Sequence, residues 1–340
     1  MAIRVLPGPR FAERTTLRLG GRARAEVSLA APEDADGLVE ALASRDARAF
    51  VLGWGSNLLA ADHDLDLAVV SLEPGQPRLA DEPACCGAES GPDAVRVLAP
   101  GGMMLPRLVS WCAANGLSGL EPLAGIPGTV GGAVAMNAGS YGRETASLLT
   151  RLLVWDSVDG TRWIGPAQWR AGYRHFEILS AASRAEVTHE AGNVQGLADQ
   201  FRKELGLEAQ APAGRQQASG ERTWLALEAE LTLRKADPKA VRAAVDQTLA
   251  RKKASQPVSA ATCGCVFKNP EGASAGKLLD ELGFKGRSLG GMRFSPMHAN
   301  FLVNEGGGTA HAALELIEQA RQAVRAARGL ELELEVRVLQ

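Results

Sequence analysis

The chain has 340 residues, of which 46% are hydrophobic and 22% charged, and 37 Lys and Arg nearly balance 39 Asp and Glu. This composition excludes a disordered or collagen-like chain. The net charge of −2 excludes the basic balance typical of a general nucleic-acid binder. A chain of this length buries roughly three quarters of its unfolded surface, so we expect a globular protein of two or three domains.

Targeting signals and cysteine usage indicate the cellular compartment in which the protein is expected. The N-terminal run MAIRVLPGPR is broken by prolines and has no apolar core, so no signal peptide is expected. Residues 122–142 carry no charge, but their prolines and glycines suit turns, so no membrane span is expected. The five cysteines are an odd number, and the five histidines form no metal-binding pattern. We therefore expect reduced thiols, no metal and a cytoplasmic location.

Hydrophobic periodicity predicts short strands alternating with helices. In chain order the predictions are a helix over 32–42, strands over 50–52 and 95–99, a helix over 105–115, and strands over 151–155 and 161–164. Residues 73–94 are rich in proline, glycine and acids and predict a connection. Residues 181–222 predict a surface insertion that contains one helix, 194–205.

The C-terminal third carries clearer signals. A helix is expected over 241–253, and another begins at the cap Thr309 and stops at Gly329. Residues 330–338 alternate strictly between apolar and charged side chains. This pattern predicts a half-buried strand whose acids lie on the face opposite the apolar row.

Two glycine clusters are candidates for binding a nucleotide cofactor. GWGSN (53–57) follows a strand and offers unhindered main-chain N–H groups that suit a pyrophosphate. GIPGTVGGAVAMNAGSYG (125–142) has small residues that let the main chain lie against a flat ring, while Thr129 and Asn137 can bond its polar edges. Neither cluster reads GxGxxG, which disfavours the usual dinucleotide-binding fold. Each cluster alone is equally compatible with a tight turn.

Seven motifs occur in one order along the chain. They are GWGSN (53–57), GLSGLEPLAGIPGTVGGAVAMNAGSYGRE (116–144), GYR (172–174), CGCVFKNP (263–270), AGKLLDELGFKG (275–286), MHANFLVN (297–304) and LEVR (334–337). Together they resemble the UDP-N-acetylenolpyruvoylglucosamine reductase (MurB) family, whose N-terminal segment is also similar to residues 15–29. The match spans most of the chain except 73–94 and 181–222.

The resemblance implies an α+β fold. Two subdomains, 1–72 and 73–235, form an FAD-binding fold of the PCMH or vanillyl-alcohol-oxidase-like type, and a smaller α/β substrate-binding domain follows over 236–340. The implied reaction reduces the enolpyruvyl ether of a UDP-amino sugar to UDP-N-acetylmuramate for peptidoglycan, with non-covalent FAD and NADPH. Negative charge develops beside the carboxylate, so the site requires a cation and a proton donor.

The resemblance and the glycine clusters together predict the cofactor contacts. These are Gly53, Gly55, Ser56, Asn57, Gly125, Ile126, Pro127, Gly128, Thr129, Gly131, Gly132 and Asn137.

Three residues match the catalytic positions of the family. Arg174 matches an arginine that holds the substrate carboxylate, a task that suits a rigid guanidinium; without the resemblance, a surface arginine is the simpler reading. Cys265 stands where most members have a proton-donating serine; the alternative is a small buried hydrophobe. A thiol, with a pKa near 8.5, donates a proton at least as readily as an alcohol. Glu335 matches a glutamate of the family, whereas periodicity alone does not choose among it, Glu331 and Glu333.

The family pattern also predicts substrate contacts, with two departures. The expected contacts are Tyr173, Lys268, Asn269 and Arg293, although Tyr173 could instead belong to the core. Ser255 stands where a lysine is frequent, which leaves Lys252 or Lys253 as the substitute cation, and Arg293 replaces a frequent glutamine.

Two other functions stay open at this point. An FAD-dependent oxidase of the same superfamily would keep the glycine clusters but has no reason to keep CGCVFKNP and LEVR. A catalytically silent flavin- or nucleotide-binding protein would tolerate the serine-to-cysteine change and the missing lysine.

Overall fold

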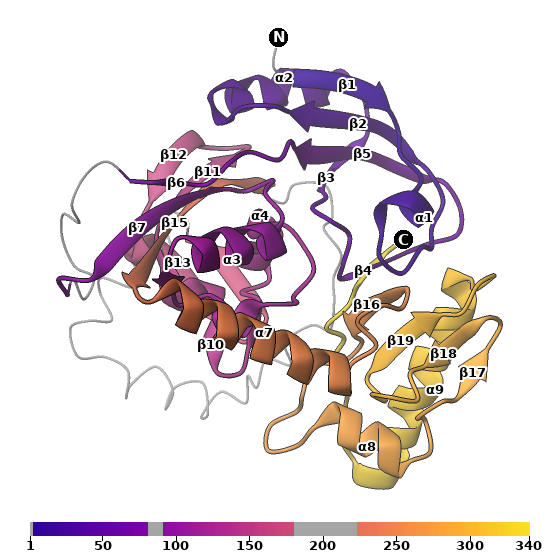
Figure 1. Ribbon diagram of the computed structural model, residues 1–340. Coiled ribbons are helices and arrows are strands. Elements are labelled where there is room, and N and C mark those ends of the chain that lie inside the picture. The colour runs from indigo at the N-terminus through magenta and orange to yellow at the C-terminus, as the bar shows by residue number, and fades with distance from the viewer. Residues whose placement is uncertain (1–2, 81–90, 180–222) are drawn as a thin grey trace, which may run out of the picture.

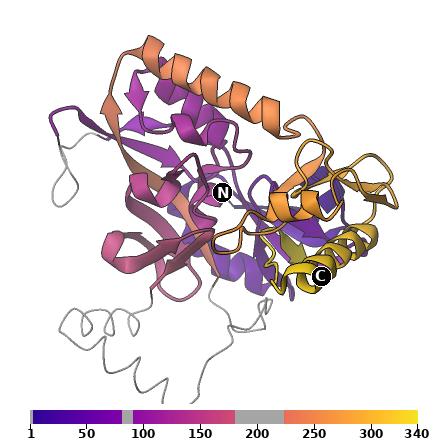
Figure 2. The same cartoon turned by 90° about the horizontal axis from the view of Figure 1, so that it is seen from below.

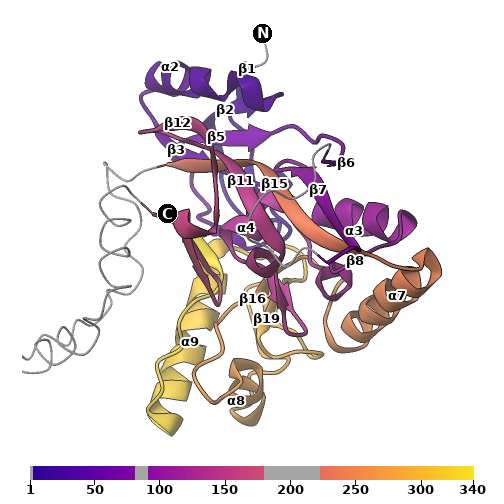
Figure 3. The ribbon, with the colours of Figure 1, turned by 90° about the vertical axis from the view of Figure 1, so that its left-hand side faces the viewer.

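The computed structural model describes residues 3–80, 91–179 and 223–340, which form three larger sheets with their helices and three two-stranded pairs (Figure 1). The predicted insertion over 181–222, its helix 194–205, and Cys85 and Cys86 lie outside the described residues. In the side view, the N-terminal part of the chain (indigo) lies at the top, the middle part (magenta) below it, and the C-terminal part (yellow) at the bottom (Figure 3).

The first sheet has the order β1–β2–β5–β3. Its strands are β1 (Ile3–Pro7), β2 (Ala23–Leu29), β5 (Leu65–Leu72) and β3 (Arg48–Val51). The strands β2, β5 and β3 run parallel, so their carboxyl ends meet at one edge. One face packs on the 3₁₀ helix η1 (Pro32–Gly37) and α2 (Leu38–Ala43), through Ala35 and Leu38, while Phe11 of α1 (Phe11–Arg14) packs on the other. The predicted helix over 32–42 therefore starts as a 3₁₀ turn.

The second sheet has the order β12–β11–β15–β7–β6, and β8 pairs with β15. The strands are β12 (Gly160–Ile164), β11 (Leu149–Asp156), β15 (Trp224–Lys235), β7 (Ala94–Pro100), β6 (Arg78–Leu79) and β8 (Leu117–Ser118). Three helices cover one face: α3 (Leu105–Ala114), α4 (Val130–Ala135) and α7 (Pro238–Ser255). From this sheet α7 runs toward the third part of the chain (Figure 2).

The two faces of β15 differ because successive side chains point to opposite sides. Ala229 and Leu231 join the helix-covered core. On the other face Glu230 is fully buried between Arg96, at 3.0 Å, and Arg151, at 2.7 Å. The guanidinium of Arg151 also lies 4.4 Å from the ring of Trp163. Ion pairs hold this face around Glu230, whereas Leu225 and Leu227, near the start of β15, pack in the apolar cluster that contains Val27 and Val70 of the first sheet.

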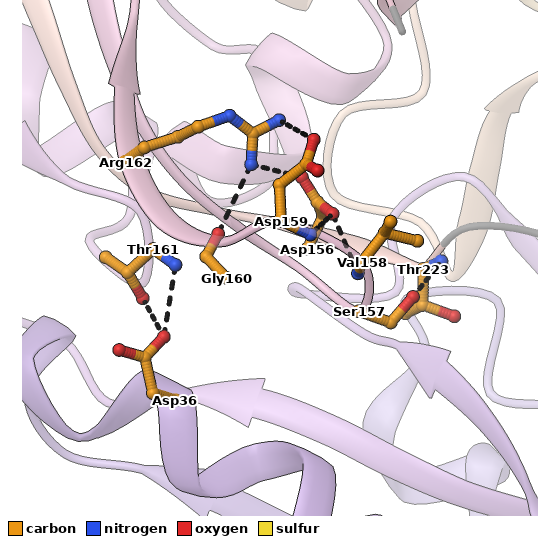
Figure 4. Close-up of polar contacts among 9 residues, drawn as sticks. All are labelled: Asp36, Asp156, Ser157, Val158, Asp159, Gly160, Thr161, Arg162 and Thr223. Atoms are coloured by element: carbon orange, nitrogen blue, oxygen red, sulfur yellow. Dashed lines mark hydrogen bonds and ion pairs between the residues drawn. The ribbon is translucent and has the colours of Figure 1, made fainter. Parts of the chain in front are cut away.

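The turn between β11 and β12 is built around one buried acid, Asp156 (Figure 4). Its Oδ1 accepts hydrogen bonds from the main-chain N–H groups of Val158, at 2.9 Å, and Asp159, at 2.8 Å. Its other oxygen accepts from Arg162. Beside this turn Thr161 donates through its N–H and hydroxyl to Asp36 of η1, which connects the first and second sheets.

Short elements connect the second sheet to the site described below. They are η2 (Glu121–Leu123), β9 (Gly139–Ser140), β10 (Arg143–Glu144), η3 (Thr145–Leu148), η4 (Pro166–Gln168), and the hairpin of β13 (Trp169–Gly172) and β14 (His175–Ile178).

The third sheet has the order β16–β19–β18–β17. Its elements are β16 (Thr262–Cys265), β19 (Phe301–Asn304), β18 (Met292–Phe294), β17 (Ser288–Leu289), α8 (Ala275–Glu281) and α9 (Ala310–Arg328). As predicted, Thr309 caps α9 and Gly329, with φ 67°, ends it. The predicted strand over 330–338 is wrong in extent. Only β20 (Arg337–Leu339) is a strand, and it pairs with β4 (Leu58–Ala60) beside the first sheet.

The division of the chain at residues 72 and 235 stays a prediction. In the described residues, each of the three larger sheets draws its strands from one segment of that division, and β4–β20 pairs the first segment with the last. In the described ranges no helix is both long and apolar enough to cross a membrane.

Candidate active site

A cavity of about 760 Å³ lies between the first and second sheets. Its lining includes β3 and the end of β5 from the first sheet, α4 and the start of β15 from the second, and Ala260, Ala261 and Arg337 from the C-terminal part. Of the predicted cofactor contacts, Gly53, Asn57, Thr129, Gly131 and Gly132 line it. Ser56 is outside this lining, and its hydroxyl donates to the carbonyl of Pro127 at 3.0 Å.

The loop 53–57 has the geometry that a pyrophosphate requires. In the described part of the chain, the main-chain N–H groups of residues 53–56 donate to no protein acceptor. A Cβ on Gly53 would lie 2.7 Å from Oγ1 of Thr129, so a larger residue would separate the two glycine clusters. Unused N–H groups on a loop whose glycine at 53 leaves no room for a side chain beside Thr129 form an anion-binding concavity. These residues fit the diphosphate of FAD.

In the second glycine cluster the two glycines of α4 have protein partners for their N–H groups. The N–H of Gly131 donates to the carbonyl of Gly101 at 2.8 Å, and that of Gly132 to the hydroxyl of Thr129 at 3.1 Å. Gly125, at φ 77°, makes room for another side chain, since a Cβ there would lie 3.2 Å from Cδ of Lys252. Close contacts with Gly101, Thr129 and Lys252 thus explain why these positions are glycines.

Asn137, which was predicted as a cofactor contact, has hydrogen-bond partners within the protein. The residue is fully buried, and its Nδ2 donates to Glu144 and to the carbonyl of Gly172, both at 2.9 Å. Its Oδ1 accepts from the N–H of Ala146 at 2.9 Å. Both N–H groups of the amide are therefore used and the side chain is enclosed by protein, so the cofactor contact stays a prediction. It anchors the base of the turn that carries Arg174.

Arg174 occupies the two-residue turn of the β13–β14 hairpin in a left-handed conformation, with φ 56°. Its Nε donates to Oε1 of Glu335 at 2.5 Å, and Nη1 donates to the carbonyl of Gly139 at 3.4 Å. Tyr173, which is exposed, lies with its ring 5.1 Å from the guanidinium. Within the described residues these bonds use two of the five N–H donors of Arg174.

Glu335 and Cys265 are brought together by main-chain pairing. The N–H of Glu335 donates to the carbonyl of Val266 at 2.8 Å, so the glutamate lies beside the residue that follows Cys265. Asn57 donates from Nδ2 to the carbonyl of Glu335 at 2.9 Å, which joins the pair to the cavity wall. Burial raises the pKa of Glu335, and the charge of Arg174 opposes that rise.

The Cys265 thiol is protonated at neutral pH. Burial raises its pKa to about 12, and the negative charge of Glu335 adds to the rise, while Arg174 acts against it. Neighbouring Cys263 is fully enclosed, and burial raises its pKa to about 12 as well. At the end of β16 the chain therefore presents a protonated sulfur next to an arginine–glutamate pair.

Lys252, rather than Lys253, is the cation near Arg174. It is 4% exposed, donates from Nζ to the carbonyl of Ala124 at 2.7 Å, and lies 5.7 Å from the ring of Tyr141. Burial, together with a smaller effect of the charge of Arg174, lowers the pKa of Lys252 to about 8. Lys253 and Ser255 are exposed.

The remaining predicted substrate contacts have protein partners. Lys268 forms an ion pair with Glu333 at 3.1 Å, and its charge acts on the pKa of Glu335. Oδ1 of Asn269 accepts from the N–H of Ala275, where α8 begins. Arg293 pairs with Glu305 at 2.8 Å. Among the described residues no group of three or more His, Cys, Asp or Glu could hold a metal ion.

Glu26 and Arg14 line the cavity and were missed from the sequence. A signal was present, since Glu26 is the one acid inside the otherwise uncharged run 25–29. A charge within a buried strand requires a partner, and that partner is not visible in the sequence.

Comparisons with known proteins agree with this geometry. Residues 256–339 match the model of the UDP-N-acetylenolpyruvoylglucosamine reductase C-terminal domain, and residues 23–164 match that of an FAD binding domain. The chain is 42% identical to the UDP-N-acetylenolpyruvoylglucosamine reductase of Oleidesulfovibrio alaskensis, over 98% of this chain and 97% of the relative. The chain belongs to the UDP-N-acetylenolpyruvoylglucosamine reductase (MurB) family.

Further members support the assignment to the MurB family. The reductase of Nitratidesulfovibrio vulgaris is 40% identical over 99% of both chains. The crystal structure of MurB from Thermus caldophilus superposes with a TM-score of 0.71 at 29% identity, covering 99% of this chain and all of that one. The predicted family and fold class, a mixed α/β chain with an FAD-binding part followed by the MurB C-terminal domain, are confirmed.

Proposed function

We propose that this protein reduces UDP-N-acetylenolpyruvoylglucosamine to UDP-N-acetylmuramate, a precursor of peptidoglycan, with FAD and NADPH. The relatives that it matches over nearly its full length carry the name of that reductase. The observation that carries the proposal is the cluster of Arg174, Glu335 and a protonated Cys265 beside the cavity. An oxidase or a silent binding protein has no use for this cluster.

When bound, FAD accepts electrons from NADPH and supplies a hydride to the vinyl carbon of the enolpyruvyl ether. Arg174 holds the substrate carboxylate with its remaining N–H donors and stabilises the negative charge that develops beside it. The Glu335 carboxylate fixes the orientation of the guanidinium through the bond to Nε. Sγ of Cys265 delivers the proton to the neighbouring carbon, which completes the saturated ether, and the thiolate regains a proton from solvent.

Lys252 is proposed as the cation that substitutes for the lysine absent at Ser255. The two positions are three residues apart on α7 and so lie near one face of the helix. Lys252 is the buried one, and Gly125 leaves space for its stem. Its ammonium group suits the diphosphate of the UDP-sugar or of NADPH.

The test is direct. Purified protein should oxidise NADPH only when the enolpyruvyl UDP-sugar is also present. The protein should be yellow and show a flavin absorption band. A yellow protein that shows no substrate-dependent NADPH oxidation would contradict the proposed reaction.

A further inference from the structure

The cavity contains a buried carboxylate that the proposed reaction does not use. Glu26, in β2, is 7% exposed and lines the cavity. Its Oε2 accepts from Nη1 of Arg14 at 2.6 Å, and its Oε1 accepts from the hydroxyl of Ser71 at 2.6 Å. Arg14, Ser71 and neighbouring Ser28 line the same cavity.

This polar group stands where one sheet face changes from apolar to polar. In the parallel pair β2–β5, Ser28 is opposite Ser71 and Glu26 is opposite Val69, so the three polar residues share one face. Earlier on that face Ala23, Leu65, Leu67 and Val69 belong to the core. Burying a carboxylate costs several kcal/mol unless it is paired. Core packing does not require an acid at this place, which indicates a ligand.

The charge of Glu26 defines the chemistry of that ligand. Burial alone would raise its pKa, but the hydrogen bonds from Arg14 and Ser71 lower the pKa overall, so the group is ionised at neutral pH. An ionised carboxylate has about four acceptor positions and no donor. Two of them are used, so the free ones suit hydroxyl or amine donors and disfavour a phosphate.

The position of Glu26 in the cavity indicates which half of the cofactor it contacts. The flavin ring must lie near Asn57, which bonds the Arg174–Glu335 pair, and the free N–H groups of 53–56 suit the diphosphate. The lining then continues along β3 and along residues 71–74, at and just beyond the end of β5. That region remains for the adenosine half.

We infer that Glu26, held by Arg14 and Ser71, accepts hydrogen bonds from the ribose hydroxyls or the exocyclic amine of the adenosine half of FAD. The inference rests on the proposed function, since it takes FAD as the occupant. It makes Glu26 a determinant of the preference for FAD over FMN, which has the same flavin ring but no adenosine.

The experiment titrates flavin-free protein with FAD and with FMN and follows flavin fluorescence. Glu26→Gln keeps the shape of the side chain and removes its charge. It should weaken FAD binding about tenfold, the effect of roughly 1.4 kcal/mol, and leave FMN binding unchanged. Ser71→Ala, a milder change, should weaken FAD binding about threefold with the same selectivity.

Glu230→Gln is the matched control, because Glu230 is also buried and paired with arginines but does not line the cavity. It should leave the ratio of FAD to FMN affinity unchanged, and thermal unfolding checks that each variant is folded. With the FAD analogue that has hypoxanthine in place of adenine, a persisting effect of Glu26→Gln assigns the bond to the ribose. Loss of that effect assigns it to the amine.

The two possible failures are distinguishable. A wild-type protein that binds neither flavin would overturn the proposed function and this inference together. If the wild type binds FAD but Glu26→Gln and Ser71→Ala weaken both flavins equally, or weaken neither, the inference alone is overturned.

Discussion

Arg174 is held in a conformation that it would not adopt by itself. A left-handed backbone costs a non-glycine residue of order 1 kcal/mol or more, and such residues persist only where their surroundings hold them. Here the surroundings are the bond from Asn137 to Gly172 at the base of the turn and the bond from the Arg174 side chain to Glu335. The turn therefore directs a preoriented guanidinium toward the end of β16.

The role of Cys265 can be separated from that of its neighbour Cys263. Cys265→Ala removes the proton donor, so we expect substrate reduction to slow by about 10³-fold. The rate at which NADPH reduces the flavin and the amount of flavin bound should both be unchanged, because neither flavin reduction nor flavin binding uses the thiol. Cys265→Ser restores an acidic hydrogen and should retain most of the activity. Stopped-flow absorbance of the flavin measures both half-reactions.

Cys263→Ala is the control for this prediction, since Cys263 is fully enclosed in the core. It should cost stability but leave the rate of substrate reduction within a few-fold. Equal reoxidation of the flavin in wild type and Cys265→Ala would remove Cys265 from the mechanism.

The lowered pKa of Lys252 predicts a pH dependence with a defined sign. Its pKa falls from 10.5 to about 8, so the ammonium group loses its charge as the pH rises through 8. The KM for the UDP-sugar should therefore rise above pH 8. In Lys252→Arg the cation stays charged, and this rise should disappear. Steady-state kinetics between pH 6 and about 10 test it, and an identical pH profile in both proteins would contradict the role.

The same shift affects stability in the opposite direction. Between pH 8 and 10.5 the unfolded chain keeps the Lys252 proton and the folded chain does not. The free energy of unfolding contributed by this group therefore increases with pH across that window. Weaker substrate binding above pH 8 would thus not be a sign of unfolding.

At the scale of elements, burial patterns were predicted better than hydrogen-bonding partners. The helix α9 was predictable because its cap, its apolar face and its terminal glycine all lie in one continuous stretch of sequence. The alternation over 330–338 does report burial, since Leu332 and Val336 are enclosed. It does not report strand pairing, because the neighbouring chain at 266–268 offers only isolated contacts. A strand needs a partner, and the sequence of one segment does not show it.

The candidate site shows the same contrast between what a local segment reveals and what depends on tertiary packing. The order of the motifs indicated Arg174, Cys265 and Glu335, although the last pair alone is separated by 70 positions and no local pattern joins them. Asn137 was assigned to the cofactor because an asparagine in a glycine-rich loop can bond any polar edge. Its protein partners at 144, 146 and 172 depend on tertiary packing.

The hairpin of β11 and β12 offers a stability prediction at this scale. Asp156→Ala would leave two main-chain N–H groups without their acceptor and would remove the buried carboxylate from Arg162, so we expect the free energy of unfolding to fall by about 3 kcal/mol. Asp159→Ala, whose carboxylate is 41% exposed and also pairs with Arg162, should cost about 0.5 kcal/mol. Urea unfolding of the two variants measures the difference, and equal losses would contradict a central role for Asp156.

At the scale of the whole molecule, the cavity is formed by segments from both ends of the chain. Residues of the first sheet, the second sheet and the C-terminal part all line it, and β20 returns the chain end to β4. A ligand that fills such a cavity binds the folded chain and not the unfolded one. The cofactor should therefore contribute to folding stability as well as to chemistry.

This gives a prediction for thermal unfolding. FAD at 100 times its dissociation constant should stabilise the fold by about 2.7 kcal/mol, which for a chain of this size raises Tm by roughly 5 °C. FMN spans less of the cavity and should bind more weakly, so at the same concentration its shift should be smaller. Differential scanning calorimetry of flavin-free protein with increasing FAD tests this, because the shift must grow with the logarithm of the FAD concentration. A Tm that does not depend on FAD would mean that the folded chain does not bind the cofactor.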